Sequence, residues 1–393
     1  MGFYFEQIQI TKQLKMRIGI YTQPLRYNYG GLLQAWALQT ILKRLGHQVV
    51  TFDPNPYKNL PWYKKPFSYC KRFINKCLGK TSIIRIETKF NKEHDIKIKN
   101  LKPFIDANIN RKEFCSPQEL RSQDYDVLIA GSDQVWRPKY NRSYGRKIEH
   151  AFFDFAKDWN VRRIAYAASF GTNTWEYNAE QTAVCSALAQ KFAAISVREE
   201  YAVNLCKIHL RVSSTWVLDP TLLLCRKDYE ELIRTGQPTH SPKGNLLCYI
   251  LDETTEAKSL IQKVSKTKGL LPFRANSHIE NKDATIEEKI QPPVEQWLRN
   301  FQEAKFVVTD SFHACVFSII FNKPFVVLGN IIRGTSRYES LFNLLSLNNH
   351  LLFTTQDFDP HKSYEIGKET YLHLKNMQDK SLQFITESLT NEK

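Results

Sequence analysis

The sequence contains no apolar run long enough to cross a membrane. Its longest such runs, ACVFSIIF (314–321) and FVVLG (325–329), are separated by Asn322, Lys323 and Pro324, whereas a spanning helix needs about 20 apolar residues. The first fifteen residues also lack the charged start, apolar middle and small-residue cleavage site of a secretion signal. These absences predict a cytoplasmic protein, either free in solution or attached to a membrane surface.

Motifs for metal ions and common cofactors are missing as well. The eight cysteines are scattered without a CxxC pair or a Cys/His cluster, which argues against a zinc site and against a disulfide framework. We expect them to be reduced and mostly buried. Neither GxGxxG nor GxxxxGKS/T occurs, so neither a dinucleotide nor ATP is indicated. The sequence predicts no cofactor and no metal.

Basic residues are concentrated in one segment. The chain carries 55 Lys and Arg against 40 Asp and Glu, a net charge of +15, and residues 58–112 contain fifteen basic and four acidic residues. Aromatic rings are interleaved with the lysines, a mixture that suits an anionic membrane surface or a nucleic acid but also a solvated basic face. Because no nucleic-acid-binding motif is present, we expect peripheral membrane contact and no nucleic-acid partner. The expected surface residues are Lys64, Lys65, Lys71 and Arg72.

Strands and helices alternate along the chain. MRIGIYT (16–22), a helix over 32–46 and HQVVTFD (47–53) form a βαβ unit, which predicts a parallel sheet with right-handed crossovers. The alternation resumes after the basic segment and restarts beyond a polar stretch at 226–245.

This pattern predicts an α/β fold with two Rossmann-like domains that face a cleft. The first covers residues 16–225 and carries the basic aromatic insertion at about 55–115, and the second covers residues 243–375. The pattern leaves open that the C-terminal helices cross back to the first domain. Open α/β sheets bind ligands at the carboxyl ends of their strands, so polar residues at these ends are the candidates for a site.

One histidine lies where a strand passes into a helix. In FVVTDSFHACVFSIIF (306–321) the strand ends at Asp310, and His313 falls in the first turn of the next helix, whose free N–H groups form a natural anion site. His313 could also be a capping or core-edge residue, and Asp310 or Ser311 could cap the helix. Its position at a strand end favours a role in binding or catalysis.

Two further strand ends carry charged side chains. Asp133 follows the apolar run VLIAG and Arg198 follows AISV. The arginine suits a carboxylate or phosphate, because its planar fork donates two parallel hydrogen bonds. The structural alternatives are an Asx-turn for Asp133 and an ion pair of Arg198 with Glu199 or Glu200.

Two loops add weaker signals. The polar stretch GNIIRGTSRYESL (329–341) supplies Arg333 and Arg337, of which one is expected to face solvent. The stretch NYGG before the first helix is predicted to be a loop that holds an anion or a sugar acceptor against its backbone N–H groups. The residues of this loop are Asn28, Tyr29, Gly30 and Gly31.

Taken together, these stretches resemble the polysaccharide pyruvyl transferase family. The matching segments follow the family's order from about Met16 to Leu345: NYGGLLQAWAL, LGHQVVTFD, DYDVLIAGSDQVW, RIAYAASFG, ISVREE, WVLDPTLLL, FVVTDSFHACVFSIIFNKPFVVL and RGTSRYESL. The resemblance implies a two-lobed fold similar to the GT-B glycosyltransferases. It also implies transfer of a pyruvyl group from phosphoenolpyruvate to a sugar of a cell-surface polysaccharide or its lipid-linked precursor, usually as a cyclic ketal.

The resemblance and the chemistry of this donor suggest roles for the selected residues. His313 is expected to be a general acid or phosphate partner, and Asp133 a base or ligand for acceptor hydroxyls. The expected donor-binding residues are Arg198, Ser311, Arg333 and Arg337. Several relatives carry arginine where this chain has Ser311, so Arg337 is expected to compensate. The alternatives are a GT-B-type glycosyltransferase that uses a nucleotide sugar and a non-catalytic sugar-binding protein.

Overall fold

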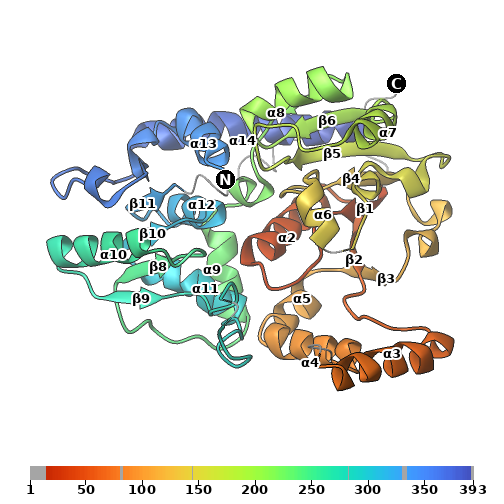
Figure 1. Ribbon diagram of the computed structural model, residues 1–393. Coiled ribbons are helices and arrows are strands. Elements are labelled where there is room, and N and C mark those ends of the chain that lie inside the picture. The colour runs from red at the N-terminus through yellow and green to blue at the C-terminus, as the bar shows by residue number, and fades with distance from the viewer. Residues whose placement is uncertain (1–14, 80–82, 144, 282, 330–333, 391–393) are drawn as a thin grey trace.

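Two parallel β-sheets organise the protein, whose computed structural model describes residues 15–79, 83–143, 145–281, 283–329 and 334–390 (Figure 1). Within these residues the sheets have seven and five strands, in the orders β3-β2-β1-β4-β5-β6-β7 and β12-β11-β10-β8-β9. The first sheet comprises β1 (Arg17–Tyr21), β2 (Gln48–Pro54), β3 (Arg111–Phe114), β4 (Val127–Ala130), β5 (Arg162–Ala168), β6 (Ala194–Val197) and β7 (Thr215–Trp216). The second comprises β8 (Leu246–Tyr249), β9 (Pro272–Arg274), β10 (Phe306–Thr309), β11 (Phe325–Leu328) and β12 (Leu351–Leu352).

Helices connect the strands and cover the sheets, as the alternating sequence pattern predicts. Those of the first half include α2 (Tyr29–Arg44), α5 (Lys102–Asn108), α6 (Pro138–Ser143), α7 (Ala179–Ala189) and α8 (Glu200–Leu205). Those of the second half include α9 (Arg226–Thr235), α10 (Thr255–Lys268), α11 (Val294–Glu303), α12 (Phe312–Ile320) and α13 (Ser336–Leu345). Strands β4, β8, β10 and β11 are buried along their whole length, which explains their uninterrupted apolar sequences.

The prediction of an α/β fold with two Rossmann-like domains is confirmed. One parallel sheet lies in each half of the chain, and a pocket lined by residues of both halves lies between them, which is a GT-B-like arrangement. The strands of the first sheet end at Trp216 and those of the second begin at Leu246.

The two domains are joined by aromatic packing and by the last helix. Tyr29, at the start of α2, stacks on Trp297 of α11 with 5.0 Å between ring centroids, and its hydroxyl donates a 2.7 Å hydrogen bond to Pro292 O. Helix α14 (Lys368–Thr390) returns to the first domain, where Gln378 Nε2 donates to Leu222 O and where the Leu218 N–H donates to a serine of the helix. One apolar core runs through both domains along these contacts.

Helix α2 begins three residues earlier than the sequence predicts. The expected loop at 28–31 is therefore wrong for Tyr29, Gly30 and Gly31, which form its first turn. The reason is local: the Asn28 side chain accepts a 3.2 Å hydrogen bond from the Gly31 N–H, so it caps the helix at this point.

The basic segment includes α5 and two further helices that lie at the edge of the first domain (Figure 1). They are α3 (Lys65–Cys77) and α4 (Ile86–Ile98), and none of the α3 residues is buried. Of the eight free cysteines, only four are buried, because Cys70, Cys77 and Cys115 are exposed and Cys225 is partly so. The expectation of mostly buried thiols is therefore wrong for the basic segment. No helix in the described parts of the chain has the length and apolarity to cross a bilayer.

Candidate functional site

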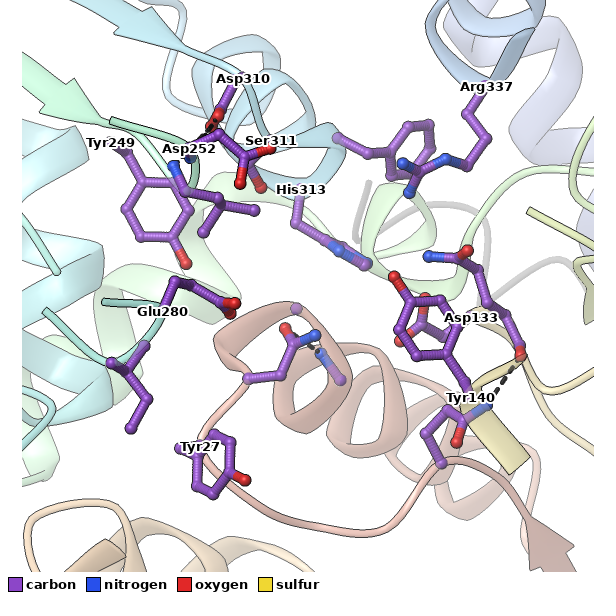
Figure 2. Close-up of a pocket in the computed structure, with 18 of the residues that line it drawn as sticks. Tyr27, Asp133, Tyr140, Tyr249, Asp252, Glu280, Asp310, Ser311, His313 and Arg337 are labelled. Atoms are coloured by element: carbon purple, nitrogen blue, oxygen red, sulfur yellow. Dashed lines mark hydrogen bonds between the residues drawn. The ribbon is translucent and has the colours of Figure 1, made fainter. Parts of the chain in front are cut away.

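The polar strand ends of both sheets converge on one pocket of about 690 Å³ between the domains (Figure 2). The first domain contributes the start of α2 and the turn after β4, and the second contributes the loops after β8 and β10 and the start of α13. Helices α2 and α12 both begin at this pocket, so the N–H groups of two helix N-termini lie in its wall. The pocket therefore combines two sources of positive potential from separate domains.

The Asp310 carboxylate links the turn before α12 to the loop after β8. The Asp310 carboxylate accepts hydrogen bonds of 2.7 and 2.8 Å from the N–H groups of Leu251 and Asp252, which fixes the loop after β8. Of the two residues that the sequence offers as the N-cap, Ser311 holds that position, but it does so without a side-chain hydrogen bond among the described residues. Ser311 lines the pocket instead.

His313 lies at the centre of the pocket wall, between groups of the first domain. A Cβ atom on Gly30 would be only 2.0 Å from His313 Nδ1, so the glycine allows the start of α2 to contact the ring. On the other side, His313 Nε2 is 3.7 Å from a carboxylate oxygen of Asp219. Within the described chain, Nε2 is buried without a hydrogen-bond partner. The ring therefore has Gly30 beside Nδ1 and Asp219 beside Nε2, and it also lines the pocket.

Asp219 is the functional candidate that the sequence reasoning missed. It follows β7 in WVLDPTLLL, so the strand-end rule that selected Asp133 and Arg198 could have found it. Its carboxylate is fully buried and accepts hydrogen bonds from Ser132 Oγ (2.9 Å), Arg198 Nη1 (3.0 Å) and the hydroxyl of a nearby threonine. Burial alone would raise the pKa of Asp219, but the neighbouring imidazole of His313 and the Arg198 guanidinium hold it well below its usual range. Asp219 is therefore a fixed negative charge beside His313.

Arg198 lies behind the pocket wall and is already paired. Its Nε donates to Glu199 Oε1 at 2.9 Å and its Nη1 to Asp219 Oδ2 at 3.0 Å, while the guanidinium stacks 4.4 Å from the centre of the Phe312 ring. It is 5% exposed and is not among the residues that line the pocket. Burial would lower the pKa of Arg198, but the carboxylates of Glu199, Asp219 and Asp133 raise it. The geometry favours an indirect role, in which Arg198 holds Asp219 and the start of α12.

Asp133 lines the pocket on the first-domain side. Its backbone has a φ of 64°, a left-handed conformation that aspartate tolerates better than most residues. Its carboxylate is 3.7 Å from Arg198 Nη1. The structural alternative for Asp133, an Asx-turn, is not seen, because no hydrogen bond to its carboxylate is present among the described residues. The alternative for Arg198, an ion pair with Glu199, is present.

Arg337 is a pocket cation that has no ion pair among the described residues. It lines the pocket from α13 and is 9% exposed. Its Nε is buried without a hydrogen-bond partner, and no carboxylate in the described chain pairs with it. Arg137 and Lys139 also line the pocket, but Arg137 forms a bidentate ion pair with Glu176 at 3.0 and 2.9 Å. Arg333 lies outside the described residues.

The predicted acceptor residues at 28–31 divide into two groups. Asn28, Gly30 and Gly31 line the pocket, whereas Tyr29 is buried in the domain interface. Asp133 and Arg337 lie together with Tyr140 on one side of His313 (Figure 2). Tyr249, Asp252 and Glu280 lie on the other side, and the sequence analysis does not predict this end of the pocket. Asp252 follows strand β8 and so obeys the strand-end rule, but Glu280 belongs to a loop without any such signal.

A structural comparison finds several solved structures that are similar to this chain. UGT89C1 of Arabidopsis thaliana complexed with UDP-L-rhamnose is 9% identical, with 96% of this chain and 98% of that chain covered and a TM-score of 0.48. Sucrose-phosphate synthase from Thermosynechococcus elongatus is 8% identical, with 94% and 98% covered and a TM-score of 0.46. A putative UDP-N-acetylglucosamine 2-epimerase from Listeria monocytogenes is 9% identical, with 94% and 91% covered and a TM-score of 0.44.

Sequence comparison identifies a protein family for this chain. Among curated proteins, none matches the chain. The family model for polysaccharide pyruvyl transferases matches residues 28–331, which include the start of α2, the turn after β4, Asp219 and His313. This match covers most of the chain and confirms the family that the sequence motifs suggest. The chain belongs to the polysaccharide pyruvyl transferase family.

Proposed function

We propose that the protein transfers a pyruvyl group from phosphoenolpyruvate to two hydroxyls of a sugar, forming a cyclic ketal and inorganic phosphate. The observation that carries this proposal is the pocket between the domains, where His313 is surrounded by two helix N-termini and by Arg337, which has no ion pair in the described parts of the chain. A small donor with a carboxylate and a phosphate is complementary to such a site, because helix N-termini and arginine both bind oxyanions.

The donor binds at the end of the pocket that holds Arg337. The guanidinium forms two parallel hydrogen bonds to the carboxylate or phosphate, and the first N–H groups of α12 with the hydroxyl of Ser311 bind the other anionic group. Arg198 does not contact the donor in this proposal, since its charge is already balanced by Glu199 and Asp219. It is a positioning residue for Asp219.

The reaction requires proton transfer at two places. A proton is added to the methylene carbon of the donor, and the oxygen of one sugar hydroxyl forms a bond to the neighbouring carbon. The bond from that carbon to the phosphate oxygen then breaks, phosphate leaves, and the second hydroxyl adds to complete the ketal. Of the two hydroxyl protons, one balances the new methyl group and the other leaves with phosphate or solvent.

His313 and Asp133 are suited to these two transfers. His313 delivers the proton to the donor, and Asp219, 3.7 Å from Nε2, balances the positive charge on the protonated ring. Asp133 lies on the same side of the ring as Arg337 and accepts the proton of the attacking hydroxyl (Figure 2). Tyr249, Asp252 and Glu280 lie on the opposite side of the ring, where their oxygen atoms hydrogen-bond the rest of the acceptor sugar.

The acceptor is a sugar of a cell-surface polysaccharide or of its lipid-linked precursor, and the reaction takes place in the cytoplasm, where phosphoenolpyruvate is available. Family membership supports this acceptor class.

The proposal is tested by donor binding followed by turnover. Calorimetry with phosphoenolpyruvate, UDP and GDP separates a pyruvyl transferase from a glycosyltransferase that uses a nucleotide sugar. Incubation with phosphoenolpyruvate and a panel of nitrophenyl or lipid-linked sugars should release phosphate and add one pyruvyl ketal to the sugar mass. Binding of a nucleotide without binding of phosphoenolpyruvate would overturn the proposal. Sugar binding without binding of either donor would instead assign the chain to non-catalytic sugar recognition.

A further inference from the structure

Helix α3 presents its apolar face to solvent. Phe67 and Leu78 are 77% and 68% exposed, and the intervening apolar side chains on the same face are exposed as well. These residues recur at the spacing of one helical stripe. The members of this outward apolar face are Phe67, Cys70, Phe73, Ile74, Cys77 and Leu78. A surface helix of a globular protein normally has the reverse orientation, with its apolar stripe on the core.

The polar face of α3 is the one that contacts the protein. Ser68, Arg72 and Asn75 are partly buried at a spacing of four and three residues, and so is the neighbouring Tyr69. Arg72 forms a bidentate ion pair with Glu87 of α4 at 2.7 and 2.6 Å and donates to Ile84 O at 3.0 Å. These bonds hold the apolar face outward. Of the four residues that the sequence suggests for the membrane surface, Arg72 thus has a partner within the protein, and the proposal below uses the three lysines.

Lysines and interfacial aromatic rings surround the outward apolar face. Trp62 and Tyr63, directly before α3, are 82% and 62% exposed. Rings of this kind, with an apolar body and a polar edge, are enriched at membrane interfaces. Four exposed lysines lie along the same stretch. They are Lys64, Lys65, Lys71 and Lys76.

We propose that α3 and residues 62–64 dock the protein on the surface of an anionic membrane, with the helix axis in the membrane plane. The outward apolar face enters the boundary between headgroups and acyl chains, and the lysines contact anionic headgroups. A second copy of the chain is a poorer occupant, because pairing two such faces would bring their lysines together. The proposal is independent of the pyruvyl transfer reaction, since vesicle binding requires neither donor nor acceptor.

Cysteine labelling of the unmodified protein tests the orientation directly. Cys70 and Cys77 belong to the outward apolar face, and Cys115 is exposed outside α3, so it is an internal control. Vesicles of three parts phosphatidylcholine to one part phosphatidylglycerol should slow maleimide labelling of Cys70 and Cys77 by about tenfold or more and leave Cys115 unchanged, as read by peptide mass spectrometry. Equal protection of Cys115 would overturn the proposal. Protection that rises with protein concentration without vesicles, together with dimers in sedimentation, would assign the face to a second copy instead.

Two triple variants separate the charged and apolar contributions. Lys64→Gln, Lys65→Gln and Lys71→Gln together should lower the partition coefficient in vesicle flotation on the order of 100-fold. Phe67→Ser, Ile74→Ser and Leu78→Ser should lower it on the order of 100-fold as well. Because all six side chains are exposed, the substitutions should leave folding and donor binding intact.

A matched control lies on the opposite side of the molecule. Lys207 and Ile208, the latter 67% exposed, follow α8, which is far from α3 in the fold (Figure 1). The pair Lys207→Gln and Ile208→Ser should float like the unmodified protein. Loss of flotation in this control equal to that of the α3 variants would overturn the assignment, as would failure of the unmodified protein to bind anionic vesicles.

Discussion

The contact between Gly30 and His313 leads to the strongest test of the site. In Gly30→Ala, the added Cβ would lie 2.0 Å from Nδ1, 2.3 Å from Cγ and 2.6 Å from Cε1 of the imidazole. Ordinary van der Waals contact begins at about 3.4 Å, so the ring must recede by about 1.4 Å. The neighbouring atoms are those of a buried aromatic ring, so the whole ring must move and not only the end of a flexible side chain.

The magnitude follows from this displacement. Misplacing a catalytic group by about 1 Å can cost about 100-fold in rate, which is about 3 kcal/mol of activation free energy. We therefore expect the rate of phosphate release at saturating donor and acceptor to fall by about 100-fold. The free energy of unfolding should change by less than the activation free energy does. Overpacking destabilises by about 1–3 kcal/mol, but replacing glycine by alanine inside a helix stabilises by about 1 kcal/mol. Affinity for phosphoenolpyruvate should stay within a few-fold, since the N–H groups of α12 and Arg337 are untouched.

The next residue in the same helix supplies the control. A Cβ on Gly31 would be 3.7 Å from Asn28 Cβ and 3.8 Å from Asp133 Oδ2, which are ordinary contacts, so Gly31→Ala should lose at most a few-fold in rate. A double-mutant cycle with His313→Ala separates displacement of the ring from blocking of the substrate. If Gly30→Ala causes the same loss in the His313→Ala background, the methyl group acts on the substrate and the reasoning is refuted. Equal rates for the two glycine variants would refute it too.

Three further predictions concern charge. Arg337→Ala should raise the dissociation constant of phosphoenolpyruvate in calorimetry by about tenfold or more, because one bidentate contact is lost; unchanged affinity would remove Arg337 from the donor site. Asp219→Asn should destabilise the protein by about 3 kcal/mol in denaturant titration, because it leaves Arg198 buried with one carboxylate fewer. The pKa of Asp219 is depressed in the folded state, so its carboxylate stabilises the protein above a pH of about 4, and this contribution is lost on acidification. The difference in the free energy of unfolding between the unmodified protein and Asp219→Asn should therefore narrow below that pH. Burial lowers the pKa of His350 to about 4, so stability should fall by up to about 3 kcal/mol as the pH drops from about 6.5 to about 4, and His350→Phe should reduce that acid sensitivity.

The fold could be predicted because its signals are local. Buried parallel strands read as continuous apolar runs, and β4, β10 and β11 are each such a run bounded by a polar turn. The sequence predicts a start of α2 that is three residues too late, because two glycines at 30 and 31 are typical of a loop. Only the contact with His313, which is far away in the chain, explains why glycine is needed inside a helix at this point.

The candidate site could be predicted in its positions but less well in its roles. The strand-end rule selects Asp133, Arg198 and His313. In the structure Arg198 and His313 both lie beside the Asp219 carboxylate, and Asp133 lies 3.7 Å from Arg198. It did not distinguish an arginine that lines the pocket from one behind it, because this depends on which carboxylates fold against it. Asp219 and Glu199 belong to separate strand ends, and only the folded sheet shows that both neutralise Arg198. The orientation of α3 had the same limit, since its sequence shows two faces but not which one Glu87 binds.

His313 belongs to the second domain, yet the groups nearest its two nitrogens come from the first. Gly30 contacts Nδ1 from the start of α2, and Asp219 lies 3.7 Å from Nε2 in the loop after β7. The same turn of α2 also joins the domains, because Tyr29 stacks on Trp297 immediately before Gly30. A movement of one domain against the other would therefore change both sides of the imidazole together. It follows that the proton chemistry of this site depends on the domain interface, and that the proposed reaction requires the two domains in the arrangement seen here.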